Sequence, residues 1–332
     1  ATAFNKSSGR SLSRIMALTR MLGGYWEYPL YTAYAVSDFR QMNHEKTGSS
    51  RKTHPFSYYN NPQSLFQSFN RYPPMSVPYW RLSAFYFCYF ATLGALIPYW
   101  SLYLKAQGFN PAQIGQLSAF LVGTKILAPN VWGWIADRSR NNLHLIRWTS
   151  FFATGLFLWF LSAGNYLEFA VFTVVFSFFW NAPLPLFEAV TLAHLGADAH
   201  RYSRVRLWGS IGFVLAVFGA GKVLDWQPIA VLPAIIVFWL GATWVSALAT
   251  PQVQPNYPEE RNVPGIWHTL KHSGVLAFLA VYVLIQLAHA PYYVFYSIYL
   301  KQYGYSTTAT GLFWALGVVA EIVLFLFMQG LL

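Results

Sequence analysis

The stretch YWSLYLKAQGFNPAQIGQLSAFLVGTK, residues 99–125, returns 196 residues later as FYSIYLKQYGYSTTATGLFWALGVVAE, residues 295–321. In each copy an apolar segment ends, a short loop with a Lys and a Gly follows, and another apolar segment begins. The final position pairs opposite charges, Lys125 and Glu321, inside apolar sequence. The residues shared by the two copies are Ser101, Tyr103, Leu104, Lys105, Gly108, Gly115, Ala119 and Val122, which correspond to Ser297, Tyr299, Leu300, Lys301, Gly304, Gly311, Ala315 and Val318.

The composition outside this repeat is that of a membrane protein. Hydrophobic residues make up 55% of the 332 residues and charged residues only 10%, whereas soluble domains carry roughly 25% charged residues. The net charge of +11 does not indicate a nucleic-acid partner, because much of the excess falls in residues 1–80 and loops account for the rest. We therefore expect a lipid bilayer as partner and no nucleic acid.

Eight apolar segments have the length of about 20 residues that spans a bilayer. They predict an all-α polytopic membrane protein whose spans are residues 81–104, 111–136, 143–163, 166–192, 207–224, 229–250, 274–300 and 307–332. Pro183 and Pro185 remove backbone donors from the fourth segment, which should bend or open there. Small residues at helical spacing in the fifth segment predict a close-packing helix face made of Gly209, Gly212, Ala216, Gly219 and Ala220.

The repeat divides the chain. We expect a six-helix half over residues 79–250, a polar linker over 251–271, and the first two helices of a second half over 272–332. Repeats of this kind are typical of secondary transporters. The chain would then be truncated at its C-terminus, and the alternative is a protein of eight helices. We expect residues 1–78 to form an irregular tail. Either the whole tail is native, or part of it is translated upstream sequence and the natural start is Met75, which stands directly before the first apolar segment.

Positive charge is distributed unequally between the loops. Lys and Arg concentrate on the cytoplasmic side of membrane proteins, which predicts a cytoplasmic N-terminus in a bacterial inner membrane. One side collects Arg138, Arg140, Arg147, Arg201, Arg204, Arg206, Arg261 and Lys271, and the other Lys105, Lys222 and Lys301.

The loop after the second segment reads GWIADRSRNN, residues 133–142. It resembles the signature loop of the major facilitator superfamily, in which a Gly is followed four residues later by Asp-Arg. Gly133, Asp137 and Arg138 match, whereas Arg140 replaces the second Gly of the family pattern. The resemblance implies that this loop latches neighbouring helices while a transporter changes conformation. A solvated turn with positive charges is the alternative reading.

Further motifs resemble the 3-phenylpropionate permease-like branch of this superfamily, itself similar to lactose and nucleoside proton symporters. The resemblance covers residues 79–332 and implies the major facilitator fold, with helices one, four and seven around a central cavity. The motifs are RVRLWGSIGF at 204–213, including Arg204 and Arg206, WNAPLPLFEA at 180–189, QLAHAPYY at 286–293 and LGVVAE at 316–321.

Charged side chains deep in a bilayer are rare and usually face a cavity or a partner. Lys125 and Glu321 therefore become candidates for substrate or proton binding, and a fixed internal ion pair or a snorkelling chain is the alternative. Cavity-lining helices add Asn181, Glu188, Gln286 and His289. Glu188 could instead pair with Arg204 or Arg206 in a basic cytoplasmic loop, and His289 could be a packing histidine.

These residues predict a monomeric, proton-coupled symporter for a small organic solute, with an aromatic carboxylate such as 3-phenylpropionate favoured. A nucleoside or sugar symporter is the alternative within the fold. A membrane sensor, or a membrane enzyme using His194, His200 and Glu188, is the alternative outside it. No metal-ligand or nucleophile motif supports an enzyme, and no cofactor is expected.

Overall fold

The computed structural model describes residues 77–139, 141–162, 164–253 and 273–331. Almost all of the predicted N-terminal tail, residues 1–78, and most of the predicted linker, residues 251–271, lie outside the described residues. Every regular element in the described part is a helix, which confirms the all-α prediction.

The helices follow the predicted segments closely. The first six predicted segments become α4 (Tyr79–Ala106), α5 (Pro111–Ser139), α6 (Asn142–Phe157) with η2 (Leu158–Leu161), α7 (Tyr166–Trp180) with α8 (Pro183–Leu195), η3 (Gly196–Arg201) with α9 (Tyr202–Trp226), and η4 (Ile229–Val231) with α10 (Leu232–Ala249). The last two become α12 (Ser273–Gln302) and α13 (Thr307–Leu331).

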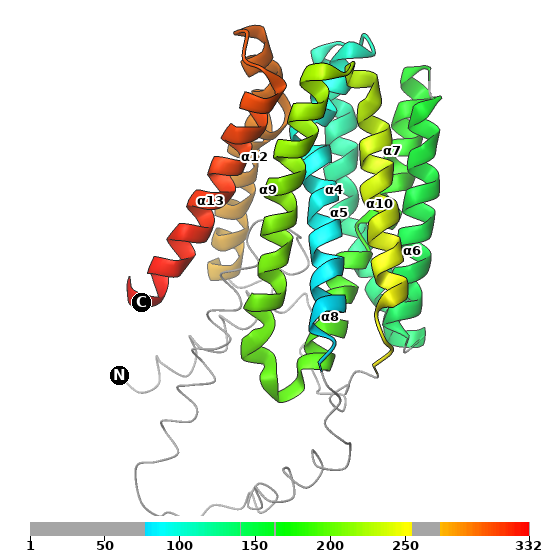
Figure 1. The fold of residues 1–332 in the computed structure, drawn as a ribbon, viewed down its shortest axis with the longest axis vertical. Helices are drawn as coiled ribbons and strands as arrows, with labels where there is room; N and C mark the ends of the chain where they lie inside the picture. The colour runs from blue at the N-terminus through cyan, green and yellow to red at the C-terminus, as the bar shows by residue number, and fades with distance from the viewer. Residues whose placement is uncertain (1–76, 140, 163, 254–272, 332) are drawn as a thin grey trace, which may run out of the picture.

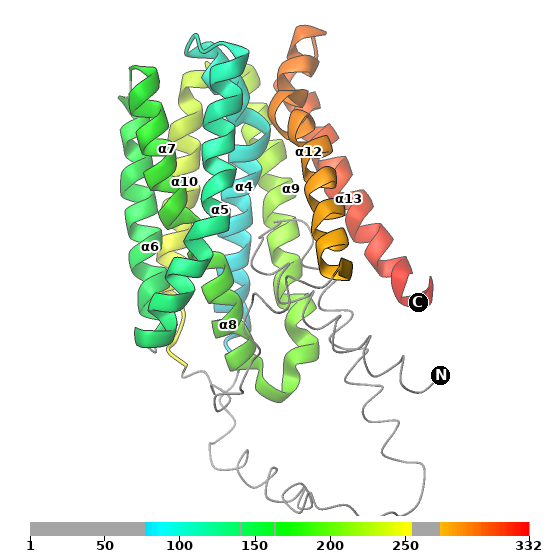
Figure 2. The same cartoon turned by 180° about the vertical axis from the view of Figure 1, so that it is seen from behind.

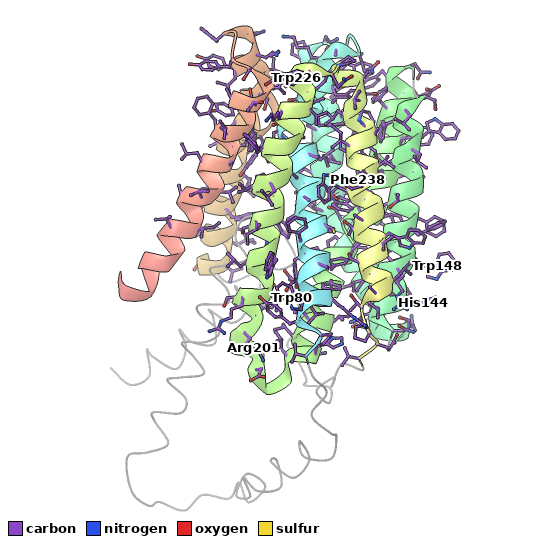
Figure 3. All side chains as sticks on the ribbon, in the orientation of Figure 1. Trp80, His144, Trp148, Arg201, Trp226 and Phe238 are labelled. Atoms are coloured by element: carbon purple, nitrogen blue, oxygen red, sulfur yellow. The ribbon has the colours of Figure 1, made fainter. Side chains whose placement is uncertain are left out.

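The helices run roughly parallel to one axis as a bundle (Figure 1). α4 packs against α9, α10 and α12, while α13 packs chiefly against α9. We call the end that holds Arg138, Arg147 and Arg201 the basic end and the other the opposite end. Figure 3 shows Arg201 and Trp226 at these two ends of the bundle. α12 and α13 stand beside α4 and α9 at the opposite end, and α13 leans away from α9 toward the basic end (Figures 1 and 2).

The core is aromatic and is centred on α4. Tyr86, Tyr89 and Tyr99 are fully buried. The Tyr89 ring stacks on Trp180 with 4.2 Å between the centroids and 8° between the planes, and Phe85 stacks on Phe187. Stacked aromatic pairs of this kind add to the stabilisation from area burial, so these rings connect α4 with α7 and α8.

Small residues let α4 and α9 approach closely. A Cβ atom added at Gly212 of α9 would lie 2.3 Å from the backbone oxygen of Phe87, and one at Gly94 of α4 would lie 2.6 Å from that of Phe213. Only glycine fits where two helix backbones meet at this distance. The predicted packing face of the fifth segment is thus confirmed at Gly212, whereas Gly219 is exposed with open space around it.

The repeat has the same backbone structure in its two loops. Gly108 and Gly304 both adopt left-handed conformations, with φ of 88° and 81°. In the first copy the backbone N–H groups of residues 107 and 109 donate to the oxygens of Tyr103 and Leu104, and in the second those of residues 303 and 305 donate to Tyr299 and Leu300. These hydrogen bonds close a helix C-terminus around a left-handed glycine.

One sequence prediction is confirmed and another needs correction. The fourth segment opens where Pro183 and Pro185 predicted, into two helices, α7 and α8, separated at Asn181 and Ala182. The fifth begins at Tyr202, five residues before the predicted start, because Tyr202 and Val205 are buried against the bundle. Arg204 and Arg206 consequently lie in the first turns of α9 and not in a loop.

Five helical stretches of the described chain are long and apolar enough to cross a membrane, where eight were expected. They are Tyr79–Ala106, Tyr166–Leu195, Tyr202–Trp226, Ile229–Ala249 and Val275–Gln302. α5 differs because polar side chains such as Lys125 and Asn130 interrupt its apolar sequence, and α6 is only 16 residues long.

Candidate functional site

A polar seam joins α5 and α7 inside the bundle. Asn181 donates from Nδ2 to Oγ1 of Thr124 at 2.9 Å, and Thr124 donates to Oγ of Ser177 at 2.8 Å. Asn181 and Ser177 are buried, and Lys125 is half-buried beside Thr124 in the sequence. The structure therefore brings Asn181 to the part of α5 that carries Lys125.

The break between α7 and α8 explains why polar groups gather here. Pro183 has no N–H to donate to the oxygen of Phe179, and Ala182 donates to that oxygen instead at 3.3 Å. The oxygen of Phe178 receives Nε1 of Trp132 at 3.0 Å. Backbone oxygens that lose their helical donor at the break thus accept hydrogen bonds from other groups. Inside a bilayer this is necessary because no water is available to donate to them.

A second polar cluster lies nearer the basic end, between α4, α8 and α9. The hydroxyl of Tyr202 donates to Oε1 of Glu188 at 3.2 Å. One turn further along α8, Thr191 accepts a hydrogen bond from the hydroxyl of Tyr86 at 3.2 Å. The Tyr86 and Tyr202 rings meet edge to face. A carboxylate is thereby held among aromatic side chains within the bundle.

Arg206 places a positive charge in the same cluster. Its guanidinium carbon lies 3.7 Å from the ring centroid of Phe90 and 5.7 Å from that of Tyr86. Cations over aromatic faces at such distances are attracted by the ring quadrupole. Nε of Arg206 is buried and has no hydrogen-bond acceptor among the described residues. Arg206 thus faces the bundle, whereas Arg204 is exposed.

The signature-loop residues lie at the basic end of α5. Asp137 is exposed in the last turn, and Arg138 stacks over the ring of Trp134 with 4.7 Å to its centroid. A Cβ atom added at Gly133 would meet open space. Their predicted role as a conformational latch stays a prediction.

The two candidates on α12 are exposed. Gln286 and His289 lie on a stretch with little burial, and Nδ1 of His289 is 2.8 Å from the backbone oxygen of Ile285 in its own helix. The ring of His289 lies beside Tyr293. The structure does not bring either residue into a hydrogen bond with the polar clusters of α5, α8 and α9.

An aromatic cluster follows on α12 and α13. Tyr292 and Tyr296 pack together with 4.7 Å between ring centroids, and both lie near the ring of Trp314. Nε1 of Trp314 donates to Oγ of Ser297 at 3.0 Å. Tyr292 is exposed and lies about one turn from His289, whereas Trp314 is buried behind it.

Two candidates remain, Glu321 and His194. Glu321 lies in α13, and its side chain is outside the described residues. Nδ1 of His194 is 2.9 Å from the backbone oxygen of Val190. The described part of the chain holds no group of His, Cys, Asp and Glu side chains that could bind a metal ion.

Sequence reasoning missed several residues of these clusters. Tyr86, Tyr202 and Thr191 carry no motif, and only their position around Glu188 reveals them. Arg147 was interpreted as a loop charge, but it donates to the backbone oxygens of Ala247, Leu248 and Thr250 at 2.9–3.2 Å. It therefore closes the C-terminus of α10 from α6.

The comparisons with known proteins agree with this architecture. The model of the MFS_1 like family matches residues 79–332. The chain is 32% identical over 251 residues to the "Probable 3-phenylpropionic acid transporter" of Escherichia coli (strain K12), covering 72% of this chain and 64% of that protein. It is 32% identical over 194 residues to the "Maltose permease" of Geobacillus stearothermophilus, covering 58% and 48%. The chain thus spans about half to two thirds of these relatives.

A solved structure shares the fold. The crystal structure of the nucleoside transporter NupG superposes with a TM-score of 0.60 at 15% identity, covering 77% of this chain and 67% of that one. The family is one of transporters and not of enzymes. The family match, the apolar helices and the shared fold together show that the chain is an integral membrane protein of the MFS_1 like family, within the major facilitator superfamily.

Proposed function

We propose that the full-length protein is a proton-coupled symporter that takes up a small aromatic carboxylate, such as 3-phenylpropionate. In this proposal α4 to α10 form one half (residues 79–250), and α12 and α13 begin a second half (residues 272–332) after a linker (residues 251–271). Substrate and proton bind between the halves, which rock against each other.

The observation that carries the proposal is the Glu188 cluster. A carboxylate that accepts a hydrogen bond from Tyr202, with the Arg206 guanidinium in the same cluster, lies within apolar helices. Ionisable groups in such places mark ion pathways and proton relays. Glu188 is accordingly the proton carrier proposed here, with Glu321 and His289 as further candidates on the second half.

The substrate class rests on two features and on one relative. Lys125 supplies a cation on α5 next to the polar seam, which suits a carboxylate. The rings of Tyr292, Tyr296 and Trp314 suit a flat apolar group. The similarity to a protein described as a 3-phenylpropionic acid transporter favours this class over the sugar suggested by the maltose permease.

Uptake driven by an imposed pH gradient tests the proposal. Vesicles with the full-length protein should accumulate labelled 3-phenylpropionate above the outside concentration, and a protonophore should abolish the excess. Unlabelled maltose and uridine should not compete. Competition by maltose or uridine would overturn the substrate class. Uptake of the same size with and without the pH gradient would overturn proton coupling.

The loop charges predict that the basic end and the N-terminus face the cytoplasm across the inner membrane. Labelling of residues at the two ends in intact cells checks this orientation.

A further inference from the structure

Asp225 of α9 binds the beginning of α13. Its Oδ1 accepts the backbone N–H of Thr307 at 2.6 Å, and its Oδ2 accepts that of Thr308 at 3.0 Å. Both carboxylate oxygens are therefore used by one helix N-terminus, across 82 and 83 residues of sequence. Hydrogen bonds to a charged acceptor are stronger than neutral ones.

The C-terminal end of α9 does not by itself stabilise a carboxylate at Asp225. It is the second-last residue of that helix, and the negative end of the helix dipole disfavours an anion there. The positive end of α13 and its unsatisfied N–H groups are what such a carboxylate requires. Asp225 is thus stabilised by α13 and not by its own helix.

The repeat shows that this contact is specific to the second copy. α5, the counterpart of α13, begins with Pro111, which has no N–H, and Asn110 and Gln113 close its first turn by mutual hydrogen bonds of 2.9 and 3.0 Å. At the matching positions α13 has Thr307 in place of the proline. The Ser306 hydroxyl accepts the backbone N–H of Ala309 at 3.0 Å, and Ala309 has no side-chain amide to return the bond as Gln113 does. The N–H group absent from the first copy is one of the two that Asp225 binds.

Close packing surrounds this contact at the opposite end of the bundle. The Tyr99 hydroxyl donates to the oxygen of Val217 on α9 at 2.7 Å and lies 3.5 Å from the oxygen of Thr307. A Cβ atom at Gly221 of α9 would lie 2.9 Å from that same Thr307 oxygen, and one at Gly311 of α13 would lie 2.9 Å from the oxygen of Val217. From here α13 leans away from α9 toward the basic end (Figures 1 and 2).

We propose that Asp225 is a latch, the side chain that holds α9 and α13 together at the opposite end and must let go when that end opens. The inference rests on the proposed function in one respect, since it takes α9 and α13 to belong to halves that separate during transport. In the first copy, Asn110 and Gln113 cap the start of α5 within one turn. The corresponding helix therefore forms without a carboxylate from another helix, so the contact of Asp225 serves to connect α9 with α13.

Two variants of the full-length protein remove the latch with little change elsewhere. Thr307→Pro installs the residue of the first copy at the first helical position, where proline is well tolerated, and deletes one donor. Asp225→Asn keeps the side-chain size but loses the charge and one acceptor. The matched control is Glu168→Gln on α7, because that carboxylate also binds near a helix start, through Gly164 and Asn165, but stays within its own turn.

The measurement is the distance between spin labels at exposed positions 227 and 302, in a background in which Cys88 and every other native cysteine of the full-length protein are replaced by serine. Both latch variants should move the equilibrium toward long distances by about tenfold or more, as expected for loss of a charged hydrogen bond, whereas Glu168→Gln should match the wild type. Unchanged distances in Thr307→Pro and Asp225→Asn, or an equal change in the control, would overturn the latch. The distances need no transport assay, so a failure of symport alone leaves this test unaffected.

Discussion

The hydroxyl of Tyr202 on α9 donates a hydrogen bond to Oε1 of Glu188 on α8, with 3.2 Å between the oxygens. The two residues are 14 positions apart and belong to helices joined by the short η3 turn. This contact ties the candidate proton carrier to the helix that also presents Arg206 and, at its other end, Asp225. Glu188 is therefore hydrogen-bonded to the helix that packs against α13.

Glu188→Gln should abolish accumulation against a gradient while exchange of substrate across the membrane continues. Glutamine keeps the shape and the acceptor for Tyr202, but it cannot gain and lose a proton. Uptake and counterflow of labelled 3-phenylpropionate measure the two activities separately. Asp198→Asn is the matched control, since that exposed carboxylate pairs with Arg201 at the same end of the bundle and should behave as the wild type. Wild-type accumulation by Glu188→Gln would contradict the assignment.

Lys125→Met should weaken carboxylate binding, and Lys125→Arg should preserve most of it. The methionine side chain fills similar space but has no charge to pair with the carboxylate. Removal of one partner of a buried charged pair should raise the KM for 3-phenylpropionate by about thirtyfold or more. Competition by 3-phenylpropanol, which lacks the carboxylate, should be unchanged by Lys125→Met. An equal loss for the acid and the alcohol would show that Lys125 acts through the fold and not on the carboxylate.

Gly212→Ala should destabilise the bundle, because its methyl group would overlap the Phe87 backbone. Overpacking of this kind costs about 1–3 kcal/mol. Gly219→Ala on the same helix meets open space and should be neutral. The fraction of protein that stays monodisperse in detergent after heating measures the difference. Equal heat resistance of the two variants would argue against the close α4–α9 crossing.

Arg147→Ala should lower the free energy of unfolding by about 1–3 kcal/mol, because several backbone oxygens at the end of α10 lose a charged donor. Arg147→Lys should restore only part of this loss, since an ammonium group cannot reproduce the planar guanidinium fork. Arg138→Ala removes an exposed arginine from the same end and serves as control. Denaturation midpoints report the order, and an Arg147→Ala midpoint equal to that of Arg138→Ala would refute the capping role.

The fold could be predicted from the sequence because its signals are local. Apolar length gave the helices, and Pro183 with Pro185 gave the opening of the fourth segment. The repeat gave the equivalence of the loops at Gly108 and Gly304, which the structure confirms by matching φ angles and hydrogen bonds. The start of α9 was placed too late, because the polar residues before Leu207 conceal a helical turn that tertiary packing of Tyr202 stabilises.

The candidate site could be predicted only in part. Charges inside apolar sequence pointed to Lys125 and Glu321, since such residues stand out in one dimension, and the resemblance to a family whose fourth helix lines a cavity pointed to Glu188. Their partners did not stand out, because Tyr86, Tyr202 and Thr124 are ordinary residues of a membrane helix until packing brings them together. Asp225 was missed for a related reason, since the sequence does not show which helix start lies beside it.

Proton uptake on substrate addition tests proton coupling through Glu188. When 3-phenylpropionate is added to lightly buffered, energy-depleted cells that contain the full-length protein, the external pH should rise. Cells with the Glu188→Gln variant, or without the protein, should show no such rise. Substrate entry with no pH change, or an equal rise with Glu188→Gln, would contradict proton coupling through Glu188.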